Sequence, residues 1–96
     1  MKHEILGFEW HDKKNEINIM KHGISFEEAV TVFDDMFAVY KQDLEHSIGE
    51  ERSYIIGHSL KNKLLVVAFT ERNQNIRIIS ARNSTKIERR YYEAQN

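Results

Sequence analysis

The chain has 96 residues with a combined mass of 11.4 kDa; 41% of them are hydrophobic and 30% are charged. This length predicts a single domain over residues 1–96, and the apolar content excludes a disordered polymer. The absence of Cys excludes disulfides and Cys-ligated metal sites. No apolar run approaches the roughly 20 residues of a membrane-spanning helix, and the N-terminus lacks the apolar segment of a secretory signal, so we expect a cytoplasmic protein that does not engage a membrane.

The net charge of −1 hides a strong asymmetry along the chain. Residues 1–59 contain 6 Lys and Arg against 12 Asp and Glu, whereas residues 60–96 contain 8 against 3. Either the second half forms a basic face that binds a polyanion, or the acidic first half neutralises it within the domain.

The first third of the chain predicts one strand and two helices. The strand covers Ile5–Trp10, and a helix then runs over residues 12–22, with Asp12 as its N-cap and Gly23 just beyond its end. Residues 25–28 have the S-x-x-E pattern of a capping box, which starts a second helix that ends at residues 34–35.

The rest of the chain predicts four strands and a final helix. The strands are expected at Met36–Tyr40, around Tyr54–Ile56, at Leu64–Thr70 and at Ile76–Ala81. A loop covers residues 43–51, and short turns cover 60–63 and 71–75. Residues 85–88 form a second capping-box pattern, which opens the last helix.

This order, β-α-α-β-β-β-β-α, predicts an α+β domain. The short turns between the last three strands indicate a small antiparallel sheet. We expect the helices to flank this sheet and to bury one of its faces.

Several short motifs recur in a characteristic order. They are F-E-W at 8–10, K-H-G-I-S-F-E-E-A at 21–29, E-E-R at 50–52, I-G-H-S at 56–59, R-I-I-S-A-R at 77–82, E-R at 88–89 and Y-E at 92–93. Together they resemble the BrnT family of ribonuclease toxins, over about Phe8–Glu93. One departure is Asp34-Asp35, where relatives commonly have Asp-Pro; it affects a turn and not the chemistry.

The resemblance implies the toxin half of a type II toxin–antitoxin pair. BrnT proteins are similar in fold to the RelE and ParE toxins, cut RNA and so inhibit translation and growth. The implied partner is a BrnA-like antitoxin, expected in a heterotetramer of two toxins and two antitoxins, and DNA would be contacted only through that antitoxin. No cofactor is expected.

Metal-free RNA cleavage needs a base for the ribose 2′-OH, an acid for the leaving 5′-oxygen and cations for the phosphoryl oxygens. Arginines suit the cationic role because each guanidinium holds two phosphate oxygens at once. The catalytic candidates of this type are Arg72, Arg77 and Arg82.

The three arginines have different settings. Arg77 lies in an apolar strand, where it either contacts phosphate or pairs with an acidic helix, and alternation places it on the same side as Ile79 and Ala81. Arg82 would then face the opposite side unless the strand ends or twists; with the amides of residues 83–85 it predicts a phosphate site at a helix N-terminus. Arg72, in a turn, is either a solvated charge or a further contact.

His22 is the candidate acid or base, because histidine titrates near neutral pH. It lies at a helix C-terminus, so the alternative is a capping residue that orders the turn after it. His46 and His58 have no carboxylate at metal-ligand spacing, and we expect no metal site.

The last helix offers further RNA contacts. Lys86, Arg89 and Arg90 are expected to be solvated cations that steer RNA toward the protein. Tyr92 is expected either to contact RNA or to pack in the core, and Glu88 to act as a capping-box and ion-pair residue.

A second hypothesis is a non-catalytic protein-binding module, or a toxin relative that has lost activity. Retention of all the arginines in the motifs favours the endoribonuclease.

Overall fold

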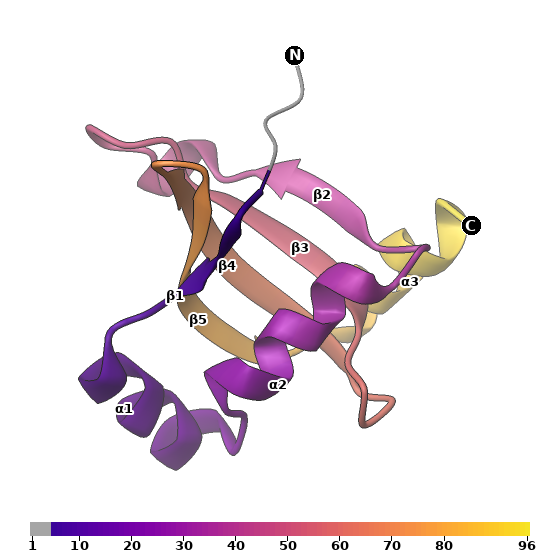
Figure 1. The fold of residues 1–96 in the computed structure, drawn as a ribbon. Coiled ribbons are helices and arrows are strands. Elements are labelled where there is room, and N and C mark those ends of the chain that lie inside the picture. Colours follow the sequence, from indigo (N-terminus) through magenta and orange to yellow (C-terminus); the bar gives the residue numbers. More distant parts are fainter. Residues whose placement is uncertain (1–4) are drawn as a thin grey trace.

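A five-stranded sheet organises the molecule, and the computed structural model describes residues 5–96 (Figure 1). The elements in chain order are β1 (Gly7–Glu9), α1 (Asp12–His22), α2 (Phe26–Thr31), η1 (Val32–Asp34), β2 (Val39–Gln42), η2 (Leu44–His46), β3 (Ser53–His58), β4 (Leu64–Arg72), β5 (Asn75–Asn83) and α3 (Lys86–Ala94). The strand order is β1-β5-β4-β3-β2, with the nearly continuous apolar β4 at the centre. The α+β class is therefore confirmed.

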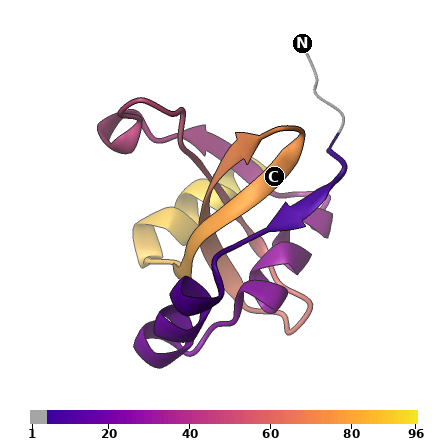
Figure 2. The ribbon, with the colours of Figure 1, turned by 60° about the vertical axis from the view of Figure 1, so that its left-hand side comes forward.

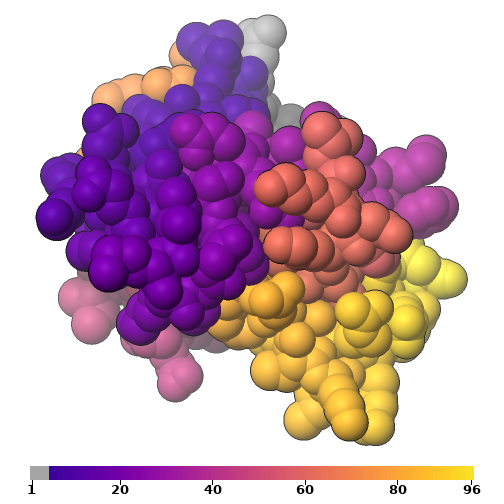
Figure 3. Space-filling model, turned by 90° about the horizontal axis from the view of Figure 1, so that it is seen from below, coloured from indigo at the N-terminus to yellow at the C-terminus, as the bar shows by residue number. Residues whose placement is uncertain are grey.

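The antiparallel arrangement predicted for the last three strands is confirmed by the β3–β4 and β4–β5 pairings, but two broader expectations about the sheet were wrong. β1 pairs with β5 in parallel, whereas the other pairings are antiparallel, so the sheet is mixed. The helices also cover both faces and not one. Viewed from below, α1 and α2 lie on one side and α3 on the other, with the β3–β4 turn between them (Figure 3).

Alternation along the central strands explains the two covered faces. Ile55 of β3 joins the large core beneath α1 and α2, and its neighbour Ile56 joins a smaller core beneath α3. Leu65 and Val67 of β4 belong to the first core in the same way, and Val66 belongs to the second. A strand that is apolar on both faces requires cover on both sides, which α3 supplies.

The helix termini follow their local chemistry. Gly23 adopts a left-handed conformation (φ 71°) and its N–H closes α1 onto Ile19, as its position after the helix predicts. The N-cap of α1 is His11, not Asp12, which is already the first helical residue. Ser25 caps α2 by accepting a hydrogen bond from the Glu28 N–H.

Two capping boxes were predicted, and one is complete. Thr85 and Glu88 exchange both hydrogen bonds at the start of α3. The Glu28 side chain instead turns away from its own cap and accepts a 2.7 Å bond from the Ser59 hydroxyl in the β3–β4 turn. Glu28 therefore ties α2 to the sheet.

The first strand after the helices begins three residues later than predicted, at Val39 in place of Met36. The cause is a turn around Asp35, whose carboxylate accepts the Phe37 N–H at 2.9 Å and whose carbonyl accepts the Ala38 N–H at 3.0 Å. Met36 sits in this turn and is 86% exposed.

The β5 strand contains one extra residue. Phe69 of β4 lies opposite Ile78, but the preceding residue Ala68 lies opposite Ser80, so Ile79 forms a β-bulge. Beyond the bulge, β1 no longer covers the outer edge of β5.

Beyond the bulge, the buried side chain of Asn18 in α1 makes the backbone hydrogen bonds that a neighbouring strand would otherwise make with β5. It accepts the Ala81 N–H at 3.1 Å and donates to the Ala81 carbonyl at 2.8 Å. It also donates to the Ile24 carbonyl at 2.8 Å. One amide therefore satisfies three buried backbone groups, which makes it a structural residue and not a surface one.

Replacing Asn18 by Ala will leave these three backbone groups without partners. Because each unsatisfied buried group costs roughly 1–3 kcal/mol, we expect the free energy of unfolding to fall by about 3 kcal/mol. Urea denaturation followed by circular dichroism measures the change. The exposed Lys14→Ala variant on the same helix is the control and should change stability by less than about 0.5 kcal/mol. Equal stabilities of the two variants would show that Asn18 does not hold the β5 edge.

Candidate functional site

The bulge at Ile79 decides where the arginines of β5 point. Arg77, before the bulge, lies opposite Thr70, and Arg82, after it, lies opposite Val66. Thr70 and Val66 are four residues apart on β4 and share one face, the face that α3 covers. Arg77 and Arg82 therefore lie on the same face of the sheet.

The alternation expected from the sequence was wrong at this point. It grouped Arg77 with Ala81, but Ala81 is fully buried in the opposite core. Ile79 is an extra residue in the strand, so the residues after it face the opposite sides from those that strict alternation predicts. The condition for a shared site, a distortion of the strand before Arg82, is thus met.

Each of the three candidate arginines holds a carboxylate. Arg72 grips Glu50 through Nε and Nη2 at 3.1 and 2.9 Å. Arg77 Nε donates to Glu9 at 3.0 Å, and Arg82 donates to both oxygens of Glu88 at 2.8 Å. The partner of Arg77 is on the adjacent strand β1 and not on an acidic helix. Carboxylate and phosphate accept the same forked pair of N–H groups, so these guanidinium groups are oriented to bind an oxyanion.

At the end of this face nearest the β4–β5 turn, called the upper end, three arginines act on one carboxylate, Glu50. The pKa of Glu50 is lowered by its hydrogen bond to Arg72 and further by the charges of Arg77 and Arg52. Arg52 was not among the candidates, although it belongs to the E-E-R motif at 50–52. It precedes β3, and extending the β3–β4 register places it opposite Thr70 and so across the sheet from Arg77.

At the lower end, Glu88 occupies the position predicted for a phosphate. Its carboxylate accepts the Thr85 N–H at 2.8 Å as well as both hydrogen bonds from Arg82. These interactions, the Arg82 hydrogen bond above all, lower the pKa of Glu88 to about 2. Glu88 thus has the capping-box and ion-pair role that its spacing predicts.

The floor between the two ends is one row of residues that crosses the sheet. Ser80 of β5, Ala68 of β4, Tyr54 of β3 and Lys41 of β2 lie opposite one another in one row across the sheet. The 43–52 connection and α3 both project on this side of the sheet (Figure 2). Next to the row, the Thr70 hydroxyl is buried without a hydrogen-bond partner in the described residues.

His22 lies at the exposed end of α1, beside the free edge of β5. It lines a hollow of about 190 Å³ together with Lys21, Ile79 and Ser80. Ser80 belongs to the floor just described, so the structure places His22 at the margin of the arginine-bearing face. Within residues 5–96, no hydrogen bond joins His22 to an arginine.

The candidates on α3 divide into two groups. Lys86, Arg89 and Arg90 are exposed cations, as expected. Tyr92 is only 7% exposed and packs beneath α3, so its ring is not presented for stacking on RNA. Burial, together with the adjacent Asp35, raises its pKa to about 12.

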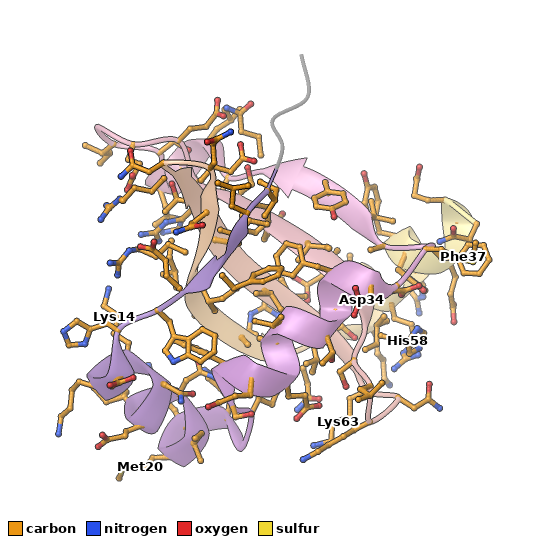
Figure 4. The ribbon with its side chains drawn as sticks, in the orientation of Figure 1. Lys14, Met20, Asp34, Phe37, His58 and Lys63 are labelled. Carbon is orange, nitrogen blue, oxygen red and sulfur yellow. The ribbon has the colours of Figure 1, made fainter. Side chains whose placement is uncertain are left out.

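Sequence reasoning missed the polar cluster around Tyr92. The Tyr92 hydroxyl donates to Asp35 Oδ2 at 2.7 Å, and the same oxygen accepts the backbone N–H of His58 at 2.8 Å. Burial opposes ionisation of Asp35, but the hydrogen bonds from His58, Tyr92 and Phe37 outweigh it and lower its pKa. Figure 4 shows His58 at this end of the sheet, near Asp34 and Phe37. The cluster joins α3 to β3 and to the turn after η1.

In the described part of the chain, no three His, Asp or Glu side chains are grouped as metal ligands. No helix of residues 5–96 is long and apolar enough to cross a membrane.

Comparison with known proteins decides the family. The model of the BrnT ribonuclease toxins of type II toxin–antitoxin systems matches residues 10–88. The chain belongs to this family. Among solved structures, the crystal structure of the Brucella abortus ribonuclease toxin BrnT is similar, with a TM-score of 0.61 and 20% sequence identity over 83% of this chain and 97% of that one. No curated protein sequence gives a significant match.

The Arg82–Glu88 pair predicts a pH-dependent contribution to stability. The pKa of Glu88 is lowered from 4.5 to about 2, so its contribution is complete above pH 4.5 and is lost as the pH falls toward 2. Glu88→Gln keeps a capping-box residue but removes the charge, and we expect it to cost about 1 kcal/mol at pH 7. Thermal unfolding between pH 2 and pH 7 should show this difference disappearing at the acidic end.

The matched control is Glu93→Gln, an exposed carboxylate on the same helix. Its stability should follow that of the unmodified protein at every pH. If Glu88→Gln and Glu93→Gln cost the same at pH 7, the ion pair with Arg82 contributes nothing.

Proposed function

We propose that this BrnT toxin is a metal-independent endoribonuclease whose active face is the α3 side of the sheet. The observation that carries the proposal is the placement of Arg77 and Arg82 on one face, each holding a carboxylate at 3.0 Å or less. In the proposed complex, phosphates of the RNA replace Glu9 and Glu88 as acceptors of the guanidinium N–H groups.

The arginines supply electrostatic stabilisation in this mechanism. The ribose 2′-OH attacks the adjacent phosphorus, and negative charge grows on the phosphoryl oxygens as the 5′-oxygen leaves. Guanidinium groups that are already oriented stabilise this charge without reorganising at the moment of reaction. Arg72 donates hydrogen bonds to Glu50, and the charge of Arg77 also acts on that carboxylate. In the proposed complex, Arg72 binds a neighbouring phosphate.

His22 is proposed as a proton-transfer residue. It approaches the face over the free edge of β5, where it shares a hollow with Ser80. Lys86, Arg89 and Arg90 extend the positive charge along the exposed side of α3 and steer RNA toward the face.

The proposed partner is a BrnA-like antitoxin, in a heterotetramer of two toxins and two antitoxins. The antitoxin would cover the arginine-bearing face, because blocking phosphate access is the most direct form of inhibition. Acidic side chains would be suitable for this purpose, since the arginines already hold carboxylates in the free toxin. The toxin acts in the cytoplasm on RNA and contacts DNA only through the antitoxin.

Metal independence has a direct test. Because the guanidinium groups supply the charge stabilisation, the purified protein should degrade single-stranded RNA equally fast in EDTA and in magnesium. Gel electrophoresis of labelled RNA follows the cleavage. Loss of activity in EDTA that magnesium restores would contradict the mechanism.

Substitutions will rank the arginines. Arg77→Ala and Arg82→Ala should each lower the cleavage rate by roughly 10²–10³, because each removes a donor to the phosphoryl group. Lys86→Ala and Arg90→Ala should cost much less, since steering charges act collectively. His22→Ala should fall between these groups. Arg72, expected in a turn, is the last residue of β4, and Arg72→Ala tests whether this end of the strand belongs to the site.

The readouts are a cleavage assay, growth during expression without antitoxin, and circular dichroism to verify folding. Folded Arg77→Ala and Arg82→Ala proteins that remain fully toxic would place the phosphate site elsewhere.

A further inference from the structure

The surface between Arg77 and Arg82 contains an aromatic ring that the mechanism does not use. Tyr54 of β3 lies opposite Ala68 of β4, which in turn lies opposite Ser80 of β5. Ala68 is smaller than its neighbours on the same face of β4, Val66 and Thr70. Tyr54 therefore lies in the row of the sheet between the rows of Arg77 and Arg82, beside the smallest side chain of β4.

The Tyr54 ring lies at the margin of the smaller core. It is half-buried and packs against the small core of Ile56, Val66 and Tyr92. It forms no aromatic pair within residues 5–96. Tyr91, the other tyrosine packed against this core from the margin, already has the Lys41 ammonium over its ring at 4.7 Å.

Tyr54 and Arg82 lie beside the same stretch of β4, Tyr54 opposite Ala68 and Arg82 opposite Val66. The pKa of Arg82 is raised mainly by its hydrogen bonds to Glu88, and the Tyr54 phenol also contributes. Arg77 lies at the other end, about 13 Å away from Arg82 along the strand, since four residues of β4 separate their partners. A half-exposed aromatic ring is thus flanked by two cations that already hold oxyanions.

We propose that Tyr54 stacks on one unpaired base of the RNA, over Ala68, while phosphates on either side of that nucleotide bind Arg77 and Arg82. This assignment rests on the proposed function of the same face and adds the substrate class, single-stranded RNA. Stacking on an aromatic side chain requires an exposed base face, which a duplex does not offer. Tyr54 is accordingly a positioning residue that is distinct from the residues that act on the phosphate.

Binding of a non-cleavable RNA tests the proposal. A fluorescent 2′-O-methyl oligonucleotide has no 2′-OH nucleophile, so its affinity can be measured by anisotropy without turnover. We expect Tyr54→Leu to weaken binding of the single strand about tenfold and Tyr54→Phe, which keeps the ring, to stay within twofold of the unmodified protein. Tyr40→Leu, an exposed tyrosine on the opposite face, is the matched control and should bind normally.

A second variant leaves Tyr54 in place. Ala68→Leu places a larger side chain opposite Tyr54 and should weaken binding to a similar degree, which keeps the proposal testable if Tyr54→Leu does not fold. The unmodified protein should also bind the single strand more tightly than the same strand in a duplex.

Three results would overturn the proposal. They are normal binding by folded Tyr54→Leu or by Ala68→Leu, equal losses in Tyr54→Phe and Tyr54→Leu, and equal affinity for single strand and duplex. Cleavage of ordinary RNA by the unmodified protein is measured in parallel. Cleavage with Tyr54-independent binding rejects this proposal alone, whereas Tyr54-dependent binding without cleavage rejects the proposed ribonuclease activity.

Discussion

The hydrogen bonds between the Asn18 amide and Ala81 secure the edge of β5 just beyond the bulge that places two arginines on the same face. Beyond the bulge at Ile79, β5 has no neighbouring strand on its outer side, and a buried strand edge cannot remain unpaired. Asn18 supplies the missing donor and acceptor from a helix. The bulge thereby becomes a stable feature that redirects side chains, as bulges beside functional sites commonly do.

Covering both faces of the sheet creates the setting for this surface. α1 and α2 bury one face, and α3 covers the other, where the partly exposed Ala68 and Ser80 lie between Arg77 and Arg82. Glu88 contributes both to α3 and to the arginine-bearing face, because its carboxylate caps the helix and accepts hydrogen bonds from Arg82. The proposed phosphate at Arg82 would displace the carboxylate that caps the start of α3, a helix that the cluster around Tyr92 anchors at its other end.

Local patterns predicted most of the elements, including the capping box at Thr85 and the helix stop at Gly23, because these depend on a few adjacent residues. The face of Arg77 was predicted wrongly, since a bulge is defined by the partner strand and leaves no mark in the alternation of β5 itself. The ion pairs with Glu9 and Glu50 were equally hidden, because 68 and 22 residues separate the partners. Tyr92 illustrates a further difficulty: its partner Asp35 is 57 residues away, so the helix pattern left burial and RNA contact equally open.

The central claim is that RNA binds the α3 face of the sheet, and nuclear magnetic resonance tests it most directly. Backbone amide signals of the labelled protein are recorded while a 2′-O-methyl single-stranded RNA is added. The account predicts shifts at Tyr54, Ala68, Ser80 and Arg82, with the amides of α2 and the fully buried core beneath it unchanged. Shifts confined to α1 and α2, with Ala68 and Ser80 unchanged, would contradict it.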